Sequence, residues 1–171
     1  MSSHLSVQRS LDRKEVAEVM ALREECPEGD RLELNHHAMS CPRDGDKHFL
    51  WRQDGVLVGY AGTVHHCSEE NEMAGMVHPS HRRRGISTAL LERAVAASRE
   101  GGFSRMLLVT ERGSESGQAF AQKHGQRRFT EHLLVLDAPS FRPCHRTVEM
   151  AELASSDIAE INDIMMQSFG E

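Results

Sequence analysis

The residues with the clearest chemical role lie between Met76 and Leu91, where a strand-like run, an arginine-rich loop and an apolar-periodic segment follow one another. Pro79 ends the strand-like run, and three arginines with one glycine form the loop at residues 82–85. Such a loop points backbone N–H groups outward at the start of a helix, whose dipole also favours negative charge. The pattern therefore predicts a phosphate-binding site in an α/β domain.

The composition is that of a soluble globular protein, with 171 residues, 39% hydrophobic and 27% charged. A net charge of −6 argues against nucleic-acid binding by the surface as a whole. Without a long apolar run or a signal-peptide pattern, we expect no membrane span and no secretion. The four cysteines form no CxxC pair, which favours free thiols in the cytoplasm, and no histidine lies in a metal-binding spacing.

Hydrophobic periodicity and turn residues predict the elements around the loop. Asp54-Gly55 indicates a β-hairpin, Ser114 can cap a helix, and Gly101-Gly102 and Gly125 can end helices. We expect strands at 4–9, 49–53, 56–65, 72–77, 106–110 and 129–137, and helices at 11–23, 31–39, 86–99 and 115–124.

The end of the chain repeats its beginning. Glu15-Val-Ala-Glu-Val19 matches Asp157-Ile-Ala-Glu-Ile161 at an offset of 142 residues, and a strand is expected before each, around Val7 and Val148. We therefore expect one domain at 1–137, a proline-bracketed linker at 138–146, and the strand and first helix of a second, truncated copy at 147–171. The alternative is a C-terminal helix that packs on the only domain.

The order of hairpin, strand, arginine-rich loop, helix, strand, helix and strand resembles the GNAT acyltransferase superfamily. The resemblance rests on Val77-His-Pro, on Arg82-Arg-Arg-Gly-Ile-Ser87 and on Leu90-Leu91. The family pattern is Arg/Gln-x-x-Gly-x-Gly/Ala, so Ser87 departs from it in the last place. The resemblance implies an α/β (α+β) fold with a mixed, mostly antiparallel central sheet, splayed central strands and flanking helices.

The resemblance also implies acetyl-CoA as cosubstrate, without a metal. Backbone amides of the loop would bind the pyrophosphate, Gly85 would allow close approach, and the arginines would supply charge. Backbone groups of Met76 and Val77 on the preceding strand would pair with the pantetheine amides, as an added strand does. The predicted cofactor-binding residues are Met76, Val77, Arg82, Arg83, Arg84, Gly85, Ile86, Ser87, Thr88 and Ser114.

The general acid that many family members use is missing here. Their pattern is similar to Asn-x-x-Ala-x-x-Phe-Tyr-x-Lys-x-Gly-Phe, and aligning Phe120 with the Phe places Ala121 at the tyrosine and Ser114 at the asparagine. The chain has one tyrosine, Tyr60, on the preceding hairpin strand. We expect Tyr60 in the core rather than in the acceptor cleft.

Glu72 is the best candidate for the general base, because it lies near the place where some family members put a carboxylate that acts through water. The alternative is an exposed glutamate at a strand end. His65, His66 and His78 also have a suitable intrinsic pKa, whereas Cys67 shows no activating partner in the sequence.

Three functions are consistent with these residues. The first is an N-acetyltransferase that moves an acetyl group from acetyl-CoA to a primary amine on a small molecule or peptide. The second is a catalytically degenerate, acyl-CoA-binding domain that supports a second catalytic domain of the same family. A nucleic-acid-binding module is disfavoured by the net charge and by an aromatic content of 5%. A second domain of the family or a homodimer is the expected protein partner.

Overall fold

The computed structural model describes residues 2–26, 39, 46–65, 69–126 and 154–169. The chain separates into two compact units, Met1–Phe129 and Thr130–Glu171, and each is described by itself. The strands predicted at 129–137 and around Val148, and nearly all of the helix predicted at 31–39, lie outside the described residues.

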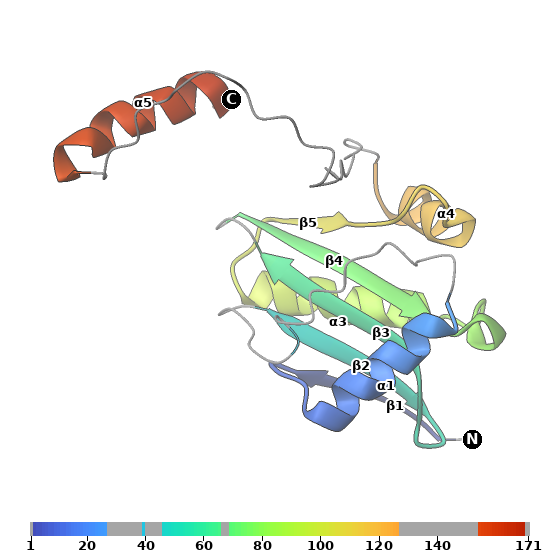
Figure 1. Cartoon of the computed structure of the whole chain (residues 1–171). Coiled ribbons are helices and arrows are strands. Elements are labelled where there is room, and N and C mark those ends of the chain that lie inside the picture. Colours follow the sequence, from blue (N-terminus) through green and yellow to red (C-terminus); the bar gives the residue numbers. More distant parts are fainter. Residues whose placement is uncertain (1, 27–38, 40–45, 66–68, 127–153, 170–171) are drawn as a thin grey trace, which may run out of the picture. The chain divides into compact units, whose positions relative to one another are not determined.

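The first unit contains a five-stranded sheet in the order β1-β2-β3-β4-β5 (Figure 1). Neighbouring strands are antiparallel except β4 and β5, which are parallel. This arrangement confirms the predicted mixed, mostly antiparallel sheet. The strands are β1 (Ser3–Gln8), β2 (Lys47–Gln53), β3 (Val56–His65), β4 (Glu70–Val77) and β5 (Arg105–Leu108).

The predicted hairpin joins β2 to β3. Asp54 and Gly55 occupy its turn with φ values of 48° and 84°, a pair of positive values that matches the twist of the two strands. A register shift between Trp51 and Arg52 marks a β-bulge in the same hairpin.

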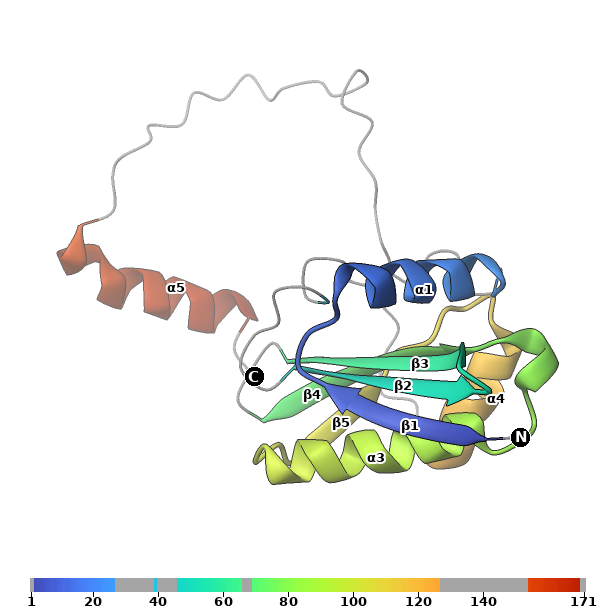
Figure 2. The same ribbon diagram turned by 90° about the horizontal axis from the view of Figure 1, so that it is seen from below.

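Helices cover both faces of the sheet, with α1 (Arg13–Glu24) on one face and α3 (Ile86–Glu100) on the other (Figure 2). The single-turn helix η2 (Pro79–His81) precedes α3, and α4 (Glu115–His124) follows β5. Asp12 caps α1 through a reciprocal pair of hydrogen bonds with Glu15.

Two apolar clusters hold these layers together. Both contain side chains of β2 and β3, because those strands are covered on both faces. The cluster under α1 comprises Leu11, Val19, Leu22, Cys26, Met39, Leu50, Leu57 and Tyr60. The cluster under α3 comprises Phe49, Val58, Ala61, Met73, Val77, Ile86, Leu90, Leu91, Ala94 and Ala97.

The parallel pair β4–β5 is short. Its register runs from Glu70 opposite Arg105 to Met73 opposite Leu108, and Val109 N–H then donates to Met73 O at 2.9 Å. Beyond Met73 the described register between the two strands ends, so the remainder of β4 has no described strand on that side. The run predicted as a buried central strand is therefore only partly buried in the described residues.

The second unit contains the single-turn helix η4 (Ser155–Asp157) and α5 (Ile158–Phe169). Ala154 N–H donates to Asp157 Oδ2 at 3.0 Å, as Asp12 N–H donates to Glu15 Oε2 at 3.1 Å before α1. These residues correspond at the offset of 142 that the sequence repeat defines. The start of α5 therefore repeats the local hydrogen bonding at the start of α1.

The side chains of α5 that correspond to buried positions of α1 are exposed within the described residues. Ile161 is 38% exposed and Ile164 is 53% exposed, whereas their counterparts Val19 and Leu22 are 0% and 4% exposed. Ile158, the counterpart of the partly buried Val16, belongs to the same stripe and is 51% exposed.

Within the described ranges, no helix has the length and apolar character needed to span a membrane. No group of three or more His, Cys, Asp or Glu side chains in the same ranges is arranged to hold a metal ion. Cys26 is a buried thiol that forms no disulfide within the described residues, while Cys41, Cys67 and Cys144 lie outside them.

Candidate functional site

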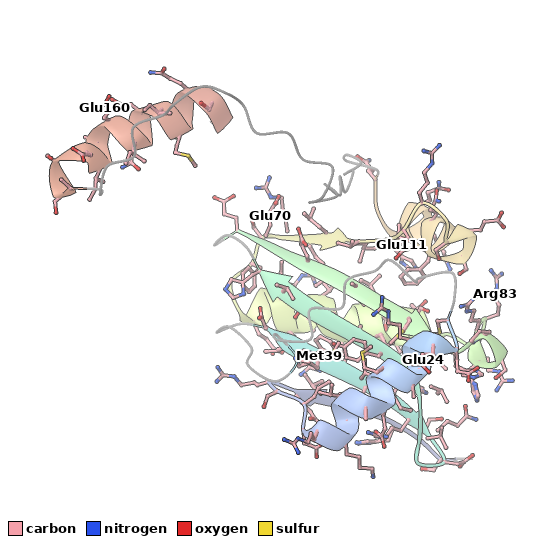
Figure 3. The ribbon with its side chains drawn as sticks, viewed as in Figure 1. Glu24, Met39, Glu70, Arg83, Glu111 and Glu160 are labelled. Atoms are coloured by element: carbon pink, nitrogen blue, oxygen red, sulfur yellow. The ribbon has the colours of Figure 1, made fainter. Side chains whose placement is uncertain are left out.

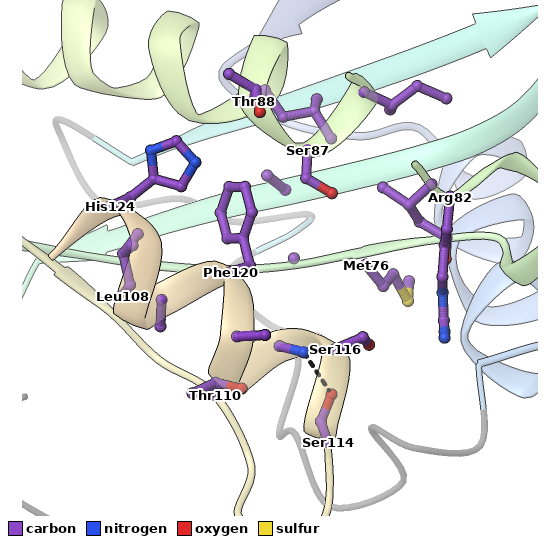
Figure 4. A pocket seen from close by; sticks show the side chains of 18 of the residues that line it. Met76, Arg82, Ser87, Thr88, Leu108, Thr110, Ser114, Ser116, Phe120 and His124 are labelled. Carbon is purple, nitrogen blue, oxygen red and sulfur yellow. Dashed lines mark hydrogen bonds between the residues drawn. The ribbon is translucent and has the colours of Figure 1, made fainter. Parts of the chain in front are cut away.

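A cleft of about 550 Å³ opens where β4 and β5 separate. Its walls come from β4, from the loop and first turn of α3, and from the segment that leads from β5 into α4. In Figure 4, Ser87 and Thr88 of α3 face Phe120 and His124 of α4 across the cleft. The size lies in the range of small-molecule sites.

The loop before α3 has the backbone of an anion-binding site. Gly85 is the N-cap residue of α3, with φ 82° and ψ −1°, and no side chain caps the helix there. Arg83 also has a positive φ of 62°. A Cβ atom on Gly85 would meet no heavy atom within 4 Å, so the space beside its backbone is open. Uncapped N–H groups at the positive end of a helix favour an anion.

The three arginines of the loop lie in different surroundings. Arg82 is half-buried, and its Nε donates to Val77 O at 3.1 Å, which ties the loop to the end of β4. Arg83 and Arg84 are exposed, and Figure 3 shows where Arg83 lies on the loop before α3. Arg82 and Arg83 line the cleft, whereas Arg84 does not.

The open side of β4 offers backbone groups to the cleft. Met73 O accepts from Val109 N–H on the β5 side, while His78 N–H donates to a carbonyl of β3 on the other side. Backbone groups alternate between the two sides of a strand. The N–H and C=O groups of Gly75 and Val77 therefore point toward the gap left by β5. Those of Met76 point toward β3, so the expectation that the backbone of Met76 faces this gap is wrong.

Gly75 is also constrained by the strand behind it. A Cβ atom there would lie 2.7 Å from Tyr60 O and 3.1 Å from Ala61 Cβ, so a larger residue would displace β3. Val77 O already accepts hydrogen bonds from Arg82 Nε and, at 3.6 Å, from Cys26 Sγ. An extended ligand along this edge would thus find the groups of Gly75 and the N–H of Val77.

The opposite wall is α4 together with its N-cap residue Ser114. Ser114 caps this helix by accepting a hydrogen bond from Gly117 N–H at 3.1 Å (Figure 4, dashed line). Phe120 and His124 pack ring against ring with centroids 4.6 Å apart. Ala121 lines the cleft at the position that aligns with the usual tyrosine of the family. The cleft therefore has no tyrosine hydroxyl at this position.

Tyr60 is a core residue, as the sequence predicts. It is 2% exposed, and its hydroxyl shares a hydrogen bond of 2.9 Å with His48 Nδ1. Its ring also borders the cleft. Burial raises the pKa of Tyr60 well above the usual value of about 10, so its phenol is neutral at physiological pH.

Glu72 lies in the middle of β4, opposite Val64, and is partly buried. It shares the α1 face of the strand with Met76, because side chains alternate and Met76 packs against the cluster under α1. It does not line the cleft. Glu72 therefore shares a face of β4 with Met76, which lines the cleft, but lies outside the lining itself.

The histidines considered as alternative bases lie elsewhere. His65 bonds through Nδ1 to Asp46 Oδ1 at 2.9 Å, and it pairs with Asn71 at the end of β4 farthest from the arginine loop. His78 caps η2 by accepting from Ser80 N–H. His66 lies outside the described residues.

Nine of the ten predicted cofactor-binding residues line the cleft, and Arg84 is the exception. Several further lining residues were not predicted from the sequence. Strand alternation could have indicated Gly75, and those from Thr110 onward follow β5 or lie in α4, whereas Cys26 follows α1 and His81 belongs to η2. These unpredicted residues are Cys26, Gly75, His81, Thr110, Glu111, Ser116, Lys123 and His124.

The profile of the acetyltransferase (GNAT) family matches residues 16–126, which include the cleft, its loop and both flanking helices. The chain belongs to the GNAT acetyltransferase family. The match ends at residue 126, so it lies within the first unit and leaves α5 outside.

A curated relative within this family is the mycothiol acetyltransferase of Kineococcus radiotolerans. It is 35% identical over 135 residues, a match that covers 74% of this chain and 40% of the relative. The chain thus spans less than half of the length of that protein.

Solved GNAT structures share the fold. The ribosomal-protein-alanine N-acetyltransferase from Brucella melitensis superposes with a TM-score of 0.61 at 17% identity, covering 80% of this chain and all of that one. A predicted acetyltransferase from Clostridium acetobutylicum, solved with acetyl-CoA, superposes with a TM-score of 0.60 at 15% identity, covering 83% of this chain and all of that one. At these identities the likeness concerns the fold.

The phenol of Tyr60 should ionise only when the protein unfolds. The pKa of Tyr60 is higher in the folded than in the unfolded state. Its contribution to the free energy of unfolding is therefore complete below about pH 10 and is lost as the pH rises above that value. A near-ultraviolet absorbance titration measures this directly, since the chain has one tyrosine. Reversible ionisation near pH 10 with an unchanged circular dichroism spectrum would contradict the burial.

Proposed function

We propose that the first unit is an acetyl-CoA-dependent N-acetyltransferase whose acceptor is a primary amine on a small molecule or peptide. The observation that carries the proposal is the uncapped N-terminus of α3, with Gly85 in the left-handed conformation and open space beside it. Membership of the GNAT family supports the same activity. A cytoplasmic location and the identity of the acceptor stay predictions.

The residues of the cleft fit coenzyme A along its length. The pyrophosphate would accept hydrogen bonds from backbone amides between Arg83 and Ser87, with Arg82 and Arg83 adding positive charge. The pantetheine amides would pair with Gly75 and Val77 on the open edge of β4. The bound cosubstrate supplies an acetyl group activated as a thioester.

Acetyl transfer to an amine needs a neutral nucleophile, hence removal of a proton from the ammonium form. We propose Glu72 for this role, acting through water, because it lies on the same strand as the cofactor groups but on the α1 face. The acceptor would then approach from the α1 side while coenzyme A occupies the other side. In many active sites a water molecule bridges two polar groups that are too far apart for a direct hydrogen bond.

A second candidate function is an acyl-CoA-binding domain without catalysis of its own. Ala121 supports it, because the cleft has no phenol where family members carry their acid, and Tyr60 is buried against His48. In this form the cleft would still bind acyl-CoA, and a second domain of the family would carry out the chemistry.

We also propose that α5 is the first helix of such a second domain, as the repeat at an offset of 142 residues predicts. In both copies a backbone N–H donates to a carboxylate three residues later, which supports this assignment. The apolar stripe of Ile158, Ile161 and Ile164 supports it too, because these residues correspond to the positions of α1 that pack against the first sheet.

Gly85→Glu should abolish acetyl-CoA binding, because it strains a backbone with φ 82° and adds a carboxylate at the anion site. Isothermal titration calorimetry measures the effect. Gly113→Glu is the matched control, since a Cβ there meets nothing within 4 Å and Gly113 does not line the cleft. Absence of binding by the unmodified chain at millimolar acetyl-CoA would refute both candidate functions.

Glu72→Gln should lower the rate of coenzyme A thiol release about 100-fold without weakening acetyl-CoA binding, if Glu72 is the base. The assay uses a panel of amines, polyamines, aminoglycosides and peptide N-termini. Glu70→Gln is the matched control on the same face of β4, where Glu70 forms an ion pair of 2.9 Å with Arg105. An equal rate in Glu72→Gln and the unmodified chain would remove Glu72 from the mechanism.

Val19→Ala should lower the free energy of unfolding by about 2 kcal/mol, since Val19 is a fully buried side chain of α1. The corresponding change Ile161→Ala should alter it by no more than about 0.5 kcal/mol if α5 belongs to a second domain. Urea unfolding followed by tryptophan fluorescence compares the two. A loss in Ile161→Ala as large as in Val19→Ala would favour a C-terminal helix that packs on the first domain.

A further inference from the structure

The single-turn helix η2 carries a chain of hydrogen bonds between two histidines and a serine. Ser80 Oγ lies 2.8 Å from His78 Nδ1 and 3.0 Å from His81 Nδ1. The two imidazole rings are 5.3 Å apart and nearly perpendicular. Of the three residues, His81 lines the cleft, next to Arg82 and Arg83.

The hydrogen bonds determine which nitrogen of each ring carries a proton. Ser80 N–H donates to His78 Nδ1 at 3.3 Å, so that nitrogen is an acceptor and has no proton. The hydroxyl of Ser80 must then donate its single proton to the same atom. Ser80 Oγ is left to accept, and His81 Nδ1–H is the donor that reaches it.

A neutral His81 therefore carries its proton on Nδ1 and presents a bare lone pair at Nε2. A bare lone pair repels a phosphate oxygen, whereas a protonated Nε2 donates a charge-assisted hydrogen bond to it. We propose that the loop takes up a proton at His81 Nε2 when it binds the pyrophosphate of coenzyme A. This inference rests on the proposed function of the cleft.

The charges around His81 agree with this coupling. Desolvation, then the positive charge of Arg84, lower the pKa of His81, so the ring is neutral near pH 7 in the free protein. The other charged groups that face it are Arg82 and Arg83 on its own loop. Across the cleft, the described charged and titratable groups are Glu111, Lys123 and His124.

Binding of a pyrophosphate reverses the balance of charge at His81, because two negative charges arrive beside the ring. The pKa of His81 is then higher in the complex than in the free protein. Affinity is greatest below the free-state pKa and falls as the pH rises through the bound-state pKa. Each unit of difference between the two corresponds to about a tenfold change in Kd.

Dephospho-CoA is the probe that isolates this effect. Its pyrophosphate diester does not titrate between about pH 5 and pH 8, whereas the 3′-phosphate monoester of coenzyme A has a pKa of about 6 and would add its own proton. Calorimetric titrations in buffers of different ionisation enthalpy give the number of protons taken up on binding. The same titrations give Kd at each pH.

For the unmodified chain we expect net proton uptake at about pH 7 and a Kd that falls roughly tenfold from pH 8 to pH 5.5. His81→Gln should bind at pH 8 with a Kd within about threefold of the unmodified chain and show no proton uptake, because glutamine offers an N–H without titrating. His124→Gln should keep the uptake, although His124 lines the same cleft.

Binding without proton uptake by the unmodified chain would overturn the inference and leave the proposed function standing. Uptake that persists in His81→Gln, or that disappears in His124→Gln instead, would also overturn it. If the unmodified chain binds neither dephospho-CoA nor acetyl-CoA at millimolar concentration, the proposed function fails together with the inference.

Discussion

The separation of β4 from β5 is the constraint on which the rest of the site depends. The two strands pair over four residues, from Glu70 to Met73 on β4, and then part. Parallel strands that stayed paired would use the backbone groups of Gly75 and Val77 and leave no cleft. Because they part, β4 has an open edge, and the helices that follow each strand form the two walls of the space between them.

The arginine loop places the start of α3 at the mouth of that space. Arg82 bonds to Val77 O at the end of β4, and Gly85 turns the chain into the helix through a conformation that disfavours other residues. The uncapped amides thus lie at the end of the cleft. There they can donate hydrogen bonds to a diphosphate group, and the helix dipole stabilises its negative charge. The cleft offers less for catalysis, since Ala121 brings no hydroxyl and Glu72 does not line it.

Much of this arrangement could be predicted from local sequence, because turns and caps depend on a few adjacent residues. Asp54-Gly55, Ser114 and Gly125 gave the hairpin and both ends of α4 correctly. The role of Gly75 could not be predicted in this way, because it depends on which side of β4 loses its partner. The hydrogen bonds that link His78, Ser80 and His81 could not be predicted either, because they depend on the fold of η2 rather than on residue types.

The central claim is that the N-terminus of α3 binds the pyrophosphate of coenzyme A. A crystal structure of the full chain with acetyl-CoA tests it most directly. We expect pyrophosphate oxygens within hydrogen-bond distance of backbone amides between Arg83 and Ser87, with the pantetheine along Gly75 and Val77. Coenzyme A bound with its pyrophosphate away from these amides would show that the N-terminus of α3 is not the anion site.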